Sequence, residues 1–447
     1  PIADERAMPD GAAVIGGAPF VSRYLETVVA RAERFFQAVV EMPLHAAAAY
    51  PAHQIAHRLL VDCGRPRFTY FARLAPPAIS VPYAQRFDDA LWAAASTLLA
   101  FDADESKVAR GQAQWRDDDG GLGLLSEARR APCAYLGSWL DSAEALANER
   151  NVIGAAGADT PLGRKLRAAY ALCVKANPMN LPSDLAAFIE GADPEIVGSK
   201  FVRRDGGIRW QALLSRGMEA AAAKKWLERS DRATRQRLEE MGGAWIRNVG
   251  SQGLVFTRDI WRVSVRLRLG LSMRPVIRDR GHADADAVTC AARSAKGKHC
   301  TAILDDYAHH AITCDQQGQL SERHDCSRDI VMTALRRCGV WVRTEQWVKE
   351  LKQERTKGKV SEARLDHVVR SGARTWWVDL SIFHPFIGRS ARSPGAVGTR
   401  AENWSLASRE RIKHRTYVTR RDGLRSAASG VLVPIVANSY AGIGEQG

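Results

Sequence analysis

The sequence has no run of about 18 or more apolar residues, although 46% of its 447 residues are hydrophobic. A bilayer-spanning helix needs such a run, so no membrane span is predicted. The first residues, Pro-Ile-Ala-Asp-Glu-Arg, contain neither an initiator methionine nor a signal peptide. We therefore expect a fragment of a longer intracellular protein, with roughly two to four domains.

The sequence also lacks an excess of acidic residues. Its 64 Lys and Arg residues outnumber its 50 Asp and Glu residues, and the formal net charge is +14. Much of the excess follows Arg328, where 22 Lys and Arg residues stand against 11 Asp and Glu residues. A basic C-terminal third fits a polyanionic partner such as nucleic acid. A merely soluble basic surface is the alternative.

Residues 1 to about 270 are predicted to be almost entirely helical. Apolar side chains recur at helical spacing in Arg23–Met42 and again in Gln85–Ala100. The glycine-rich stretch 120–124 is expected to be a flexible entry to a further helix over Pro132–Ala147, because proline suits the first turn.

Two acidic pairs could be mistaken for a polymerase metal site. Asp88 and Asp89 lie inside a predicted amphipathic helix, which makes them a solvated face. Asp305 and Asp306 lie between clustered Cys and His residues. Neither pair has the flanking strands of a polymerase hairpin, so no polymerase active site is predicted here.

Arg364–Ile382 has the pattern of two short strands joined by a turn at Arg370–Arg374, because both halves are rich in β-branched and aromatic residues. Each strand carries one carboxylate, Asp366 and Asp379. Such a pair can converge on one hard cation, Mg²⁺ or Mn²⁺, which activates water and stabilises charge on a phosphate. Two solvent-facing aspartates at a sheet edge are the alternative.

A predicted helix over Trp404–Asp422 follows, with Lys413 and Tyr417 four residues apart on one face. A lysine near two metal-binding carboxylates can position the attacking water or neutralise the phosphate.

The order acid, acid, displaced lysine resembles the PD-(D/E)xK nucleases of the restriction-enzyme type. Leu365 stands where this motif has proline, and Ser381 stands where it has lysine, so Lys413 would supply that charge. A lysine displaced onto the following helix, with Tyr417 four residues later, resembles the C-terminal endonuclease of site-specific non-LTR retrotransposons.

Several other stretches are similar to the region after the polymerase fingers and palm of these retrotransposon reverse transcriptases. They are residues 14–21, 71–77, 87–91, 120–124, 134–139 and 261–272. The resemblance implies a multidomain chain: an all-α thumb and linker over 1–270, a small zinc knuckle over 285–326, and an α/β PD-(D/E)xK domain over 327–447.

The zinc ligands implied by this resemblance are Cys300, His309 and Cys314, whose spacing looks like the second half of the Cys-Cys-His-Cys knuckle. Clustered Cys and His in an intracellular chain favour metal over disulfides. A closed Zn²⁺ site needs four N or S ligands, and Cys290 is the nearest upstream thiol. His310 is an alternative to His309 as the histidine ligand. His299 and Cys326 are alternatives to Cys290 as the fourth ligand.

Further residues are candidates for contacts to metal or nucleic acid. Arg323 and His324 resemble the Arg-His pair that trails the knuckle, in a structural or nucleic-acid-binding role. They precede an amphipathic helix predicted over Ser327–Cys338. Glu345, after a strand that begins at Val340, matches an auxiliary metal ligand of restriction-type nucleases, with a surface acid as the alternative. The charged loop 349–359 offers four lysines to DNA phosphates: Lys349, Lys352, Lys357 and Lys359.

The resemblance implies a metal-dependent endonuclease that nicks double-stranded target DNA for retrotransposon integration. It implies Mg²⁺ or Mn²⁺ in the nuclease, a structural Zn²⁺, element RNA as a second partner and a nuclear location. The polymerase would lie upstream of Pro1. An inactive remnant that only binds nucleic acid is the main alternative, because of the departures at Leu365 and Ser381. A host nuclease unrelated to transposition is another.

Overall fold

The first long helices carry the apolar stripes that their sequences predict. α1 (Ala18–Glu41) buries seven side chains on one face, and α4 (Pro77–Leu99) packs against it. The rings of Phe36 in α1 and Phe87 in α4 lie 5.3 Å apart, edge to face. This pair begins the hydrophobic core of the helical part.

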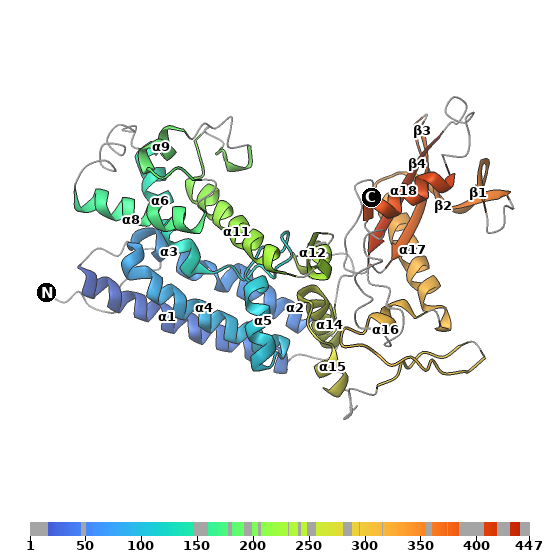
Figure 1. Cartoon of the computed structure of the whole chain (residues 1–447), viewed down its shortest axis with the longest axis horizontal. Coiled ribbons are helices and arrows are strands. Elements are labelled where there is room, and N and C mark those ends of the chain that lie inside the picture. The colour runs from blue at the N-terminus through green and yellow to red at the C-terminus, as the bar shows by residue number, and fades with distance from the viewer. Residues whose placement is uncertain are drawn as a thin grey trace. The chain divides into compact units, whose positions relative to one another are not determined.

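The computed structural model describes residues 17–45, 51–145, 160–177, 181–191, 199–203, 207–230, 232–239, 243–247, 256–279, 288–294, 296–314, 316–354, 360–372, 374–383, 406–417 and 430–438. The chain forms two compact units, residues 1–229 with 246–262, and residues 230–245 with 263–447. No helix in the described ranges combines the length and the apolar character that crossing a bilayer requires. The described structure is mostly helical, with one small sheet near the C-terminal end (Figure 1).

The elements before the sheet are all helices. They are α1, η1 (Met42–His45), α2 (Ala52–Arg58), η2 (Leu59–Gly64), α3 (Pro66–Leu74), α4, α5 (Ala103–Ala113), α6 (Glu127–Ala145), α8 (Pro161–Ala176), α9 (Leu185–Glu190), η3 (Ser199–Phe201), α11 (Trp210–Arg229), α12 (Arg232–Glu239), α13 (Ala244–Arg247), α14 (Arg258–Leu269), α15 (Arg274–Asp279), α16 (His309–Thr313), η5 (Gln316–Gly318) and α17 (Gln319–Arg337). The described part of the first 270 residues is mostly helical, as predicted, with loops and one isolated antiparallel bridge between Val202 and Ile208.

α6 begins earlier than predicted, and Asp88 of α4 explains why. Its carboxylate accepts hydrogen bonds from Ser126 Oγ at 2.6 Å, Glu127 N at 2.8 Å and Ala128 N at 3.1 Å. These groups form the first turn of α6, which lacks intrahelical acceptors. The predicted start at Pro132 is therefore wrong. The expectation that Asp88 faces solvent is also wrong, since the residue is 5% exposed.

The glycine-rich stretch before α6 is packed, contrary to the expected flexible entry. Leu122 and Leu124 in it are buried. A Cβ atom on Gly121 would lie 2.2 Å from the carbonyl oxygen of Trp115, so only glycine permits this close approach.

The predicted hairpin is present within a four-stranded sheet. β1 (Trp341–Glu354), β2 (Val360–Ser371) and β3 (Arg374–Phe383) pair antiparallel in that order, and β4 (Gly430–Asn438) lies parallel to β3. α18 (Leu406–Tyr417) lies between β3 and β4 in sequence. The β2–β3 turn contains Gly372 at φ +57°, a conformation that favours glycine.

Two predicted boundaries near the sheet differ from the structure. The charged segment 349–359 was expected to be a loop, but β1 extends through Glu354 and β2 begins at Val360. α17 begins at Gln319, eight residues before the predicted Ser327, and it crosses the expected border between residues 326 and 327.

Helices α17 and α18 cover opposite faces of the sheet. Val378 of β3 belongs to a buried cluster against which Met332 and Leu335 of α17 pack. The next residue of β3, Asp379, contacts Lys413 of α18 instead. Adjacent strand residues point to opposite faces, so the two helices approach the sheet from its two sides.

The buried carboxyl of Asp88 predicts a pH dependence of stability. Burial raises its pKa from 3.8 to about 6, although the hydrogen bonds that it accepts oppose the rise. Because the folded pKa lies above the unfolded value, its stabilising contribution is complete below about pH 4 and is lost as pH rises through about 6. Raising the pH from about 4 to 7 should cost the parent chain about 2 to 3 kcal/mol relative to Asp88→Asn.

Thermal unfolding followed by circular dichroism across this pH range measures the difference. The matched control is Asp89→Asn, because the neighbouring Asp89 is exposed and paired only with Arg110 among the described contacts. Parallel pH profiles for the parent and Asp88→Asn chains would contradict the prediction.

Candidate functional site

A short antiparallel ladder brings Cys290 and Cys300 together. Cys290 N donates to Ala302 O at 2.8 Å, and Cys300 N donates to Ala292 O at 2.8 Å. In this register the two cysteines are diagonal neighbours across the two segments. Their side chains therefore lie on one face of the ladder.

The other two candidate ligands come from α16. His310 lies in this helix and Cys314 is its C-terminal cap, so the two are four residues apart on one helix face. Asp305 accepts a hydrogen bond from His309 N at 2.8 Å and so holds the start of the helix. The turn before it contains Ala308 at φ +54°.

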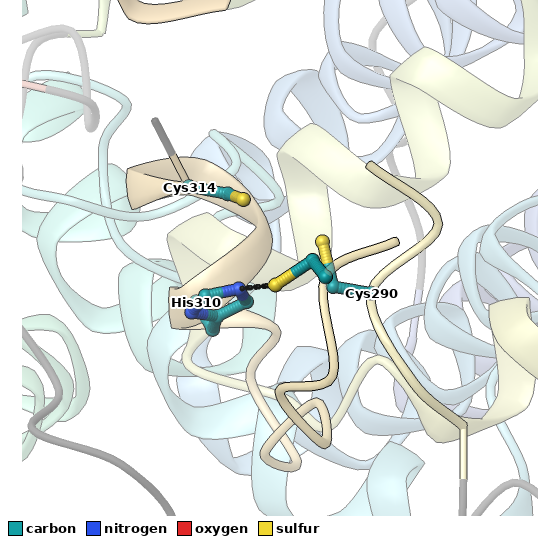
Figure 2. A group of neighbouring side chains, drawn as sticks. Cys290, His310 and Cys314 are labelled. Carbon is teal, nitrogen blue, oxygen red and sulfur yellow. Dashed lines mark hydrogen bonds between the residues drawn. The ribbon is translucent and has the colours of Figure 1, made fainter. Parts of the chain in front are cut away.

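These segments assemble one group of soft ligands. The ligand atoms of Cys290, Cys300, His310 and Cys314 all lie within 4.8 Å of one another. Figure 2 shows Cys290, His310 and Cys314 gathered at one place. His310 Nε2 lies 3.2 Å from Cys300 Sγ. Three sulfurs and one imidazole nitrogen are a Cys₃His set, which could hold a metal such as zinc in a closed site.

The pKa of Cys314 bears on how the group would bind a metal cation. Burial and the neighbouring thiols Cys290 and Cys300 raise the pKa of Cys314 to about 11, although a backbone hydrogen bond opposes the rise. Without a cation the Cys314 thiol stays protonated, and a bound Zn²⁺ would displace its proton. The chemistry of this donor set therefore suits zinc.

One predicted zinc ligand is wrong. His309, chosen from the family spacing, lies outside the group, and its Nδ1 contacts Asp305 Oδ2 at 3.3 Å. Its ring also stacks on Tyr307. The competitor His310 takes the place, and the four-residue helical spacing to Cys314 is the sequence signal that favoured it. Cys290 is the fourth member, and neither His299 nor Cys326 belongs to the group.

The two aspartates lie where the β2–β3 ladder ends. Its pairs run from Ser371–Arg374 at the turn to His367–Val378, and the next residue of each strand is Asp366 or Asp379. Beyond that point Leu380 N donates to Asp366 Oδ2 at 2.6 Å, so a side chain replaces the backbone acceptor. Both aspartates are largely buried, which argues against the alternative of a solvent-facing pair.

Lys413 of α18 reaches this point from 34 residues away in the sequence. Its Nζ donates to Asp379 Oδ2 at 2.7 Å, and its charge also acts on Asp366. The predicted acid, acid and displaced lysine therefore lie together. Ser381, where the usual motif lysine would stand, is buried and two residues beyond Asp379.

His324 of α17 completes the surroundings of Asp366. Its Nε2 lies 3.5 Å from Asp366 Oδ2 and 3.3 Å from the carbonyl oxygen of Leu380. The hydrogen bond to Asp366 raises the pKa of His324 and outweighs burial. Burial acts to raise the pKa of Asp366, but the hydrogen bonds from His324 and Leu380 and the charge of Lys413 lower it overall. Asp366 is therefore held as a carboxylate.

Glu345, predicted as an auxiliary metal ligand, forms ion pairs with two arginines. Its φ of +51° is unusual for a non-glycine strand residue. Its carboxylate binds Arg328 of α17 at 2.6 Å and Arg364 of β2 at 2.5 Å. These two guanidinium groups are the described partners of the Glu345 carboxylate. Arg328 also pairs with Asp325, which contacts His324, so the ion-pair network reaches Asp366 only through His324.

The remaining candidates are only partly visible. Lys349 and Lys352 belong to β1, and Tyr417 is the last residue of α18, but the placement of their side chains is not described. Lys357 and Lys359 lie outside the described residues. The catalytic role of Tyr417 and the contacts of the four lysines to nucleic acid stay predictions.

The described residues do not support a magnesium site in the way that they support the zinc site. Across the described ranges, the Cys₃His set is the only group of three or more candidate ligands within 4.8 Å. Asp366 and Asp379 would supply two carboxylates. Mg²⁺ is often bound by one or two carboxylates together with water and phosphate oxygens, so the pair fits this cation in chemistry.

No protein-family model matches the chain, and no curated protein matches it. The likeness to a retrotransposon protein thus rests on the motifs quoted from the sequence.

We predict that the purified chain holds about one zinc ion in the Cys₃His set. His310→Ala or Cys314→Ser should lose that zinc, because each removes a ligand. His309→Ala is the matched control and should keep it, because His309 contacts Asp305 instead. Elemental analysis of the purified variants gives the zinc content. Loss of zinc from His309→Ala with retention in His310→Ala would restore the ligand originally predicted.

Proposed function

We propose that the second unit is a metal-dependent DNA endonuclease with Asp366, Asp379 and Lys413 at its active site. The observation that carries the proposal is the convergence of all three at the end of the β2–β3 ladder. Lys413 contacts Asp379 at 2.7 Å although 34 residues and a separate helix intervene. This arrangement supports the PD-(D/E)xK type of nuclease site.

Each residue has a distinct role in this proposal. Asp366 and Asp379 would hold a Mg²⁺ or Mn²⁺ ion. When bound, that ion supplies an activated water and neutralises charge on the scissile phosphate. Lys413 would orient the water or stabilise the negative charge that develops on the phosphate. His324 and the backbone N–H of Leu380 keep Asp366 ionised and oriented.

The proposed substrate is double-stranded DNA. The residues after Arg328 carry twice as many Lys and Arg as Asp and Glu, which favours binding to a polyanion. The motif order of helical part, Cys₃His set and nuclease supports a fragment of a retrotransposon protein. As part of this retrotransposon assignment, we also propose element RNA as a second partner and a nuclear location.

A second candidate function, nucleic-acid binding without cleavage, is favoured by the ion pairs of the carboxylates. Asp379 has Lys413 as a cationic partner, and Asp366 has His324. These pairs stabilise the site without a metal. Leu365 and Ser381 also depart from the usual nuclease motif.

Nicking of supercoiled plasmid with Mg²⁺, with Mn²⁺ and with EDTA separates the two candidates. Asp366→Ala, Asp379→Ala and the double variant should each lose more than about 100-fold in rate, and the losses should not add. Lys413→Ala should slow nicking by about 100-fold while DNA binding survives. Asp329→Ala, an exposed acid on α17, is the control and should nick normally. A parent chain that binds DNA but never nicks it would favour the binding module.

DNA binding by phosphate contacts predicts a strong dependence on salt. The logarithm of the affinity should fall with the logarithm of salt concentration, with a slope of about −0.9 per phosphate neutralised. The double variant Lys357→Ala, Lys359→Ala should therefore reduce the magnitude of the slope by about 2. Lys107→Ala on α5, with a side chain 80% exposed, should leave it unchanged. Fluorescence anisotropy at several salt concentrations measures the slopes, and a salt-independent affinity would exclude this mode of binding.

A further inference from the structure

Two adjacent residues of α17 contact the two candidate sites. Arg323 Nη1 donates to the carbonyl oxygen of Ile312 at 3.1 Å, and Ile312 lies in α16 between His310 and Cys314. His324 contacts Asp366 Oδ2 and the Leu380 carbonyl oxygen. Because one peptide bond joins Arg323 to His324, a chain of contacts runs from α16 through α17 to Asp366.

The Arg323 contact holds the end of α16. α16 has only five residues, so the carbonyl of Ile312 lies in the last turn, where helical carbonyls have no intrahelical donor. A guanidinium group is a strong donor to such a carbonyl. The Arg323 side chain is partly buried at this contact, and the burial lowers its pKa.

The His324 contact holds the end of the β2–β3 ladder. A carbonyl oxygen only accepts, so His324 Nε2 must carry a hydrogen and donate it to Leu380 O. The same nitrogen faces Asp366 Oδ2, and that oxygen accepts from Leu380 N at 2.6 Å. The described contacts of Asp366 all use Oδ2, so the imidazole sets the direction in which the carboxylate lies without engaging Oδ1.

We propose that Arg323 and His324 are positioning residues that couple metal loading of the Cys₃His set to the orientation of Asp366. Metal bound by His310 and Cys314 fixes the α16 turn, and Arg323 transmits that position to α17. His324, the next residue, then holds Asp366 and Leu380. The consequence for nicking rests on the proposed nuclease function, whereas the consequence for the Leu380 hydrogen bond does not.

Amide hydrogen exchange at Leu380, measured on the full chain by mass spectrometry with site-resolving fragmentation, tests the coupling directly. His324→Ala should speed this exchange about tenfold, because Asp366 is then no longer held as the acceptor. His324→Gln, which keeps a side-chain N–H donor, should restore slow exchange. Amides of Val369 and Trp376, a β2–β3 pair nearer the turn, serve as the internal control for folding, because they belong to the same sheet and unit as Leu380.

Arg323→Ala should speed Leu380 exchange by a similar factor while zinc stays bound. Arg323→Lys should restore much of the protection, because it keeps a cationic donor. Arg337→Ala removes the same charge from an exposed position of α17 and should change nothing. Cys314→Ser should act like Arg323→Ala, and combining the two should add little, because both break one chain of contacts.

The outcomes separate the coupling from the nuclease proposal. Fast Leu380 exchange in Arg323→Ala and Cys314→Ser, with unchanged exchange at Val369 and Trp376, supports the coupling even if the parent chain never nicks DNA. Unchanged Leu380 exchange in Cys314→Ser, or equal effects of Arg323→Ala and Arg337→Ala, overturns it even if the chain nicks. If Leu380 exchanges as fast in His324→Gln as in His324→Ala, the imidazole acts by packing alone. That result would also overturn the coupling.

Discussion

The candidate site depends on how the sheet satisfies its backbone where β2 and β3 stop pairing. Leu380 is the second residue of β3 beyond the last β2–β3 pair, and its N–H and carbonyl need partners other than β2 backbone. Asp366 accepts from the N–H, and His324 donates to the carbonyl. A structural requirement of the strand end thus places a carboxylate and an imidazole beside Asp379.

The two helices around this strand end contribute from opposite faces. α17 brings the imidazole of His324, and α18 brings the ammonium group of Lys413, so the carboxylates lie between these two side chains. This arrangement lowers the pKa of Asp366 despite burial. The Cys₃His segment has only a very small buried hydrophobic cluster to stabilise it. A metal there would replace a hydrophobic core, and Arg323 joins its helix to α17.

Much of the fold was predictable because it follows from local periodicity. The spacing of apolar residues predicts α1 and α4, and β-branched and aromatic residues predict the β2–β3 hairpin. The errors occur where a residue distant in the sequence decides the local structure. α6 begins at Glu127 because Asp88, 39 residues earlier, accepts its first N–H. Glu345 is turned to Arg328 and Arg364 at a positive φ that no local pattern indicates.

The sequence by itself determined which chemical groups are available: three clustered thiols with two histidines, two aspartates on neighbouring strands, and a lysine on the following helix. It left open which histidine joins the thiols. The four-residue spacing from His310 to Cys314 favours His310 only once both are known to lie on one helix, and Asp305 holds the start of that helix. The sequence also could not assign His324 to Asp366. That contact depends on how α17 packs against the sheet, and packing is set by long-range burial of apolar surface.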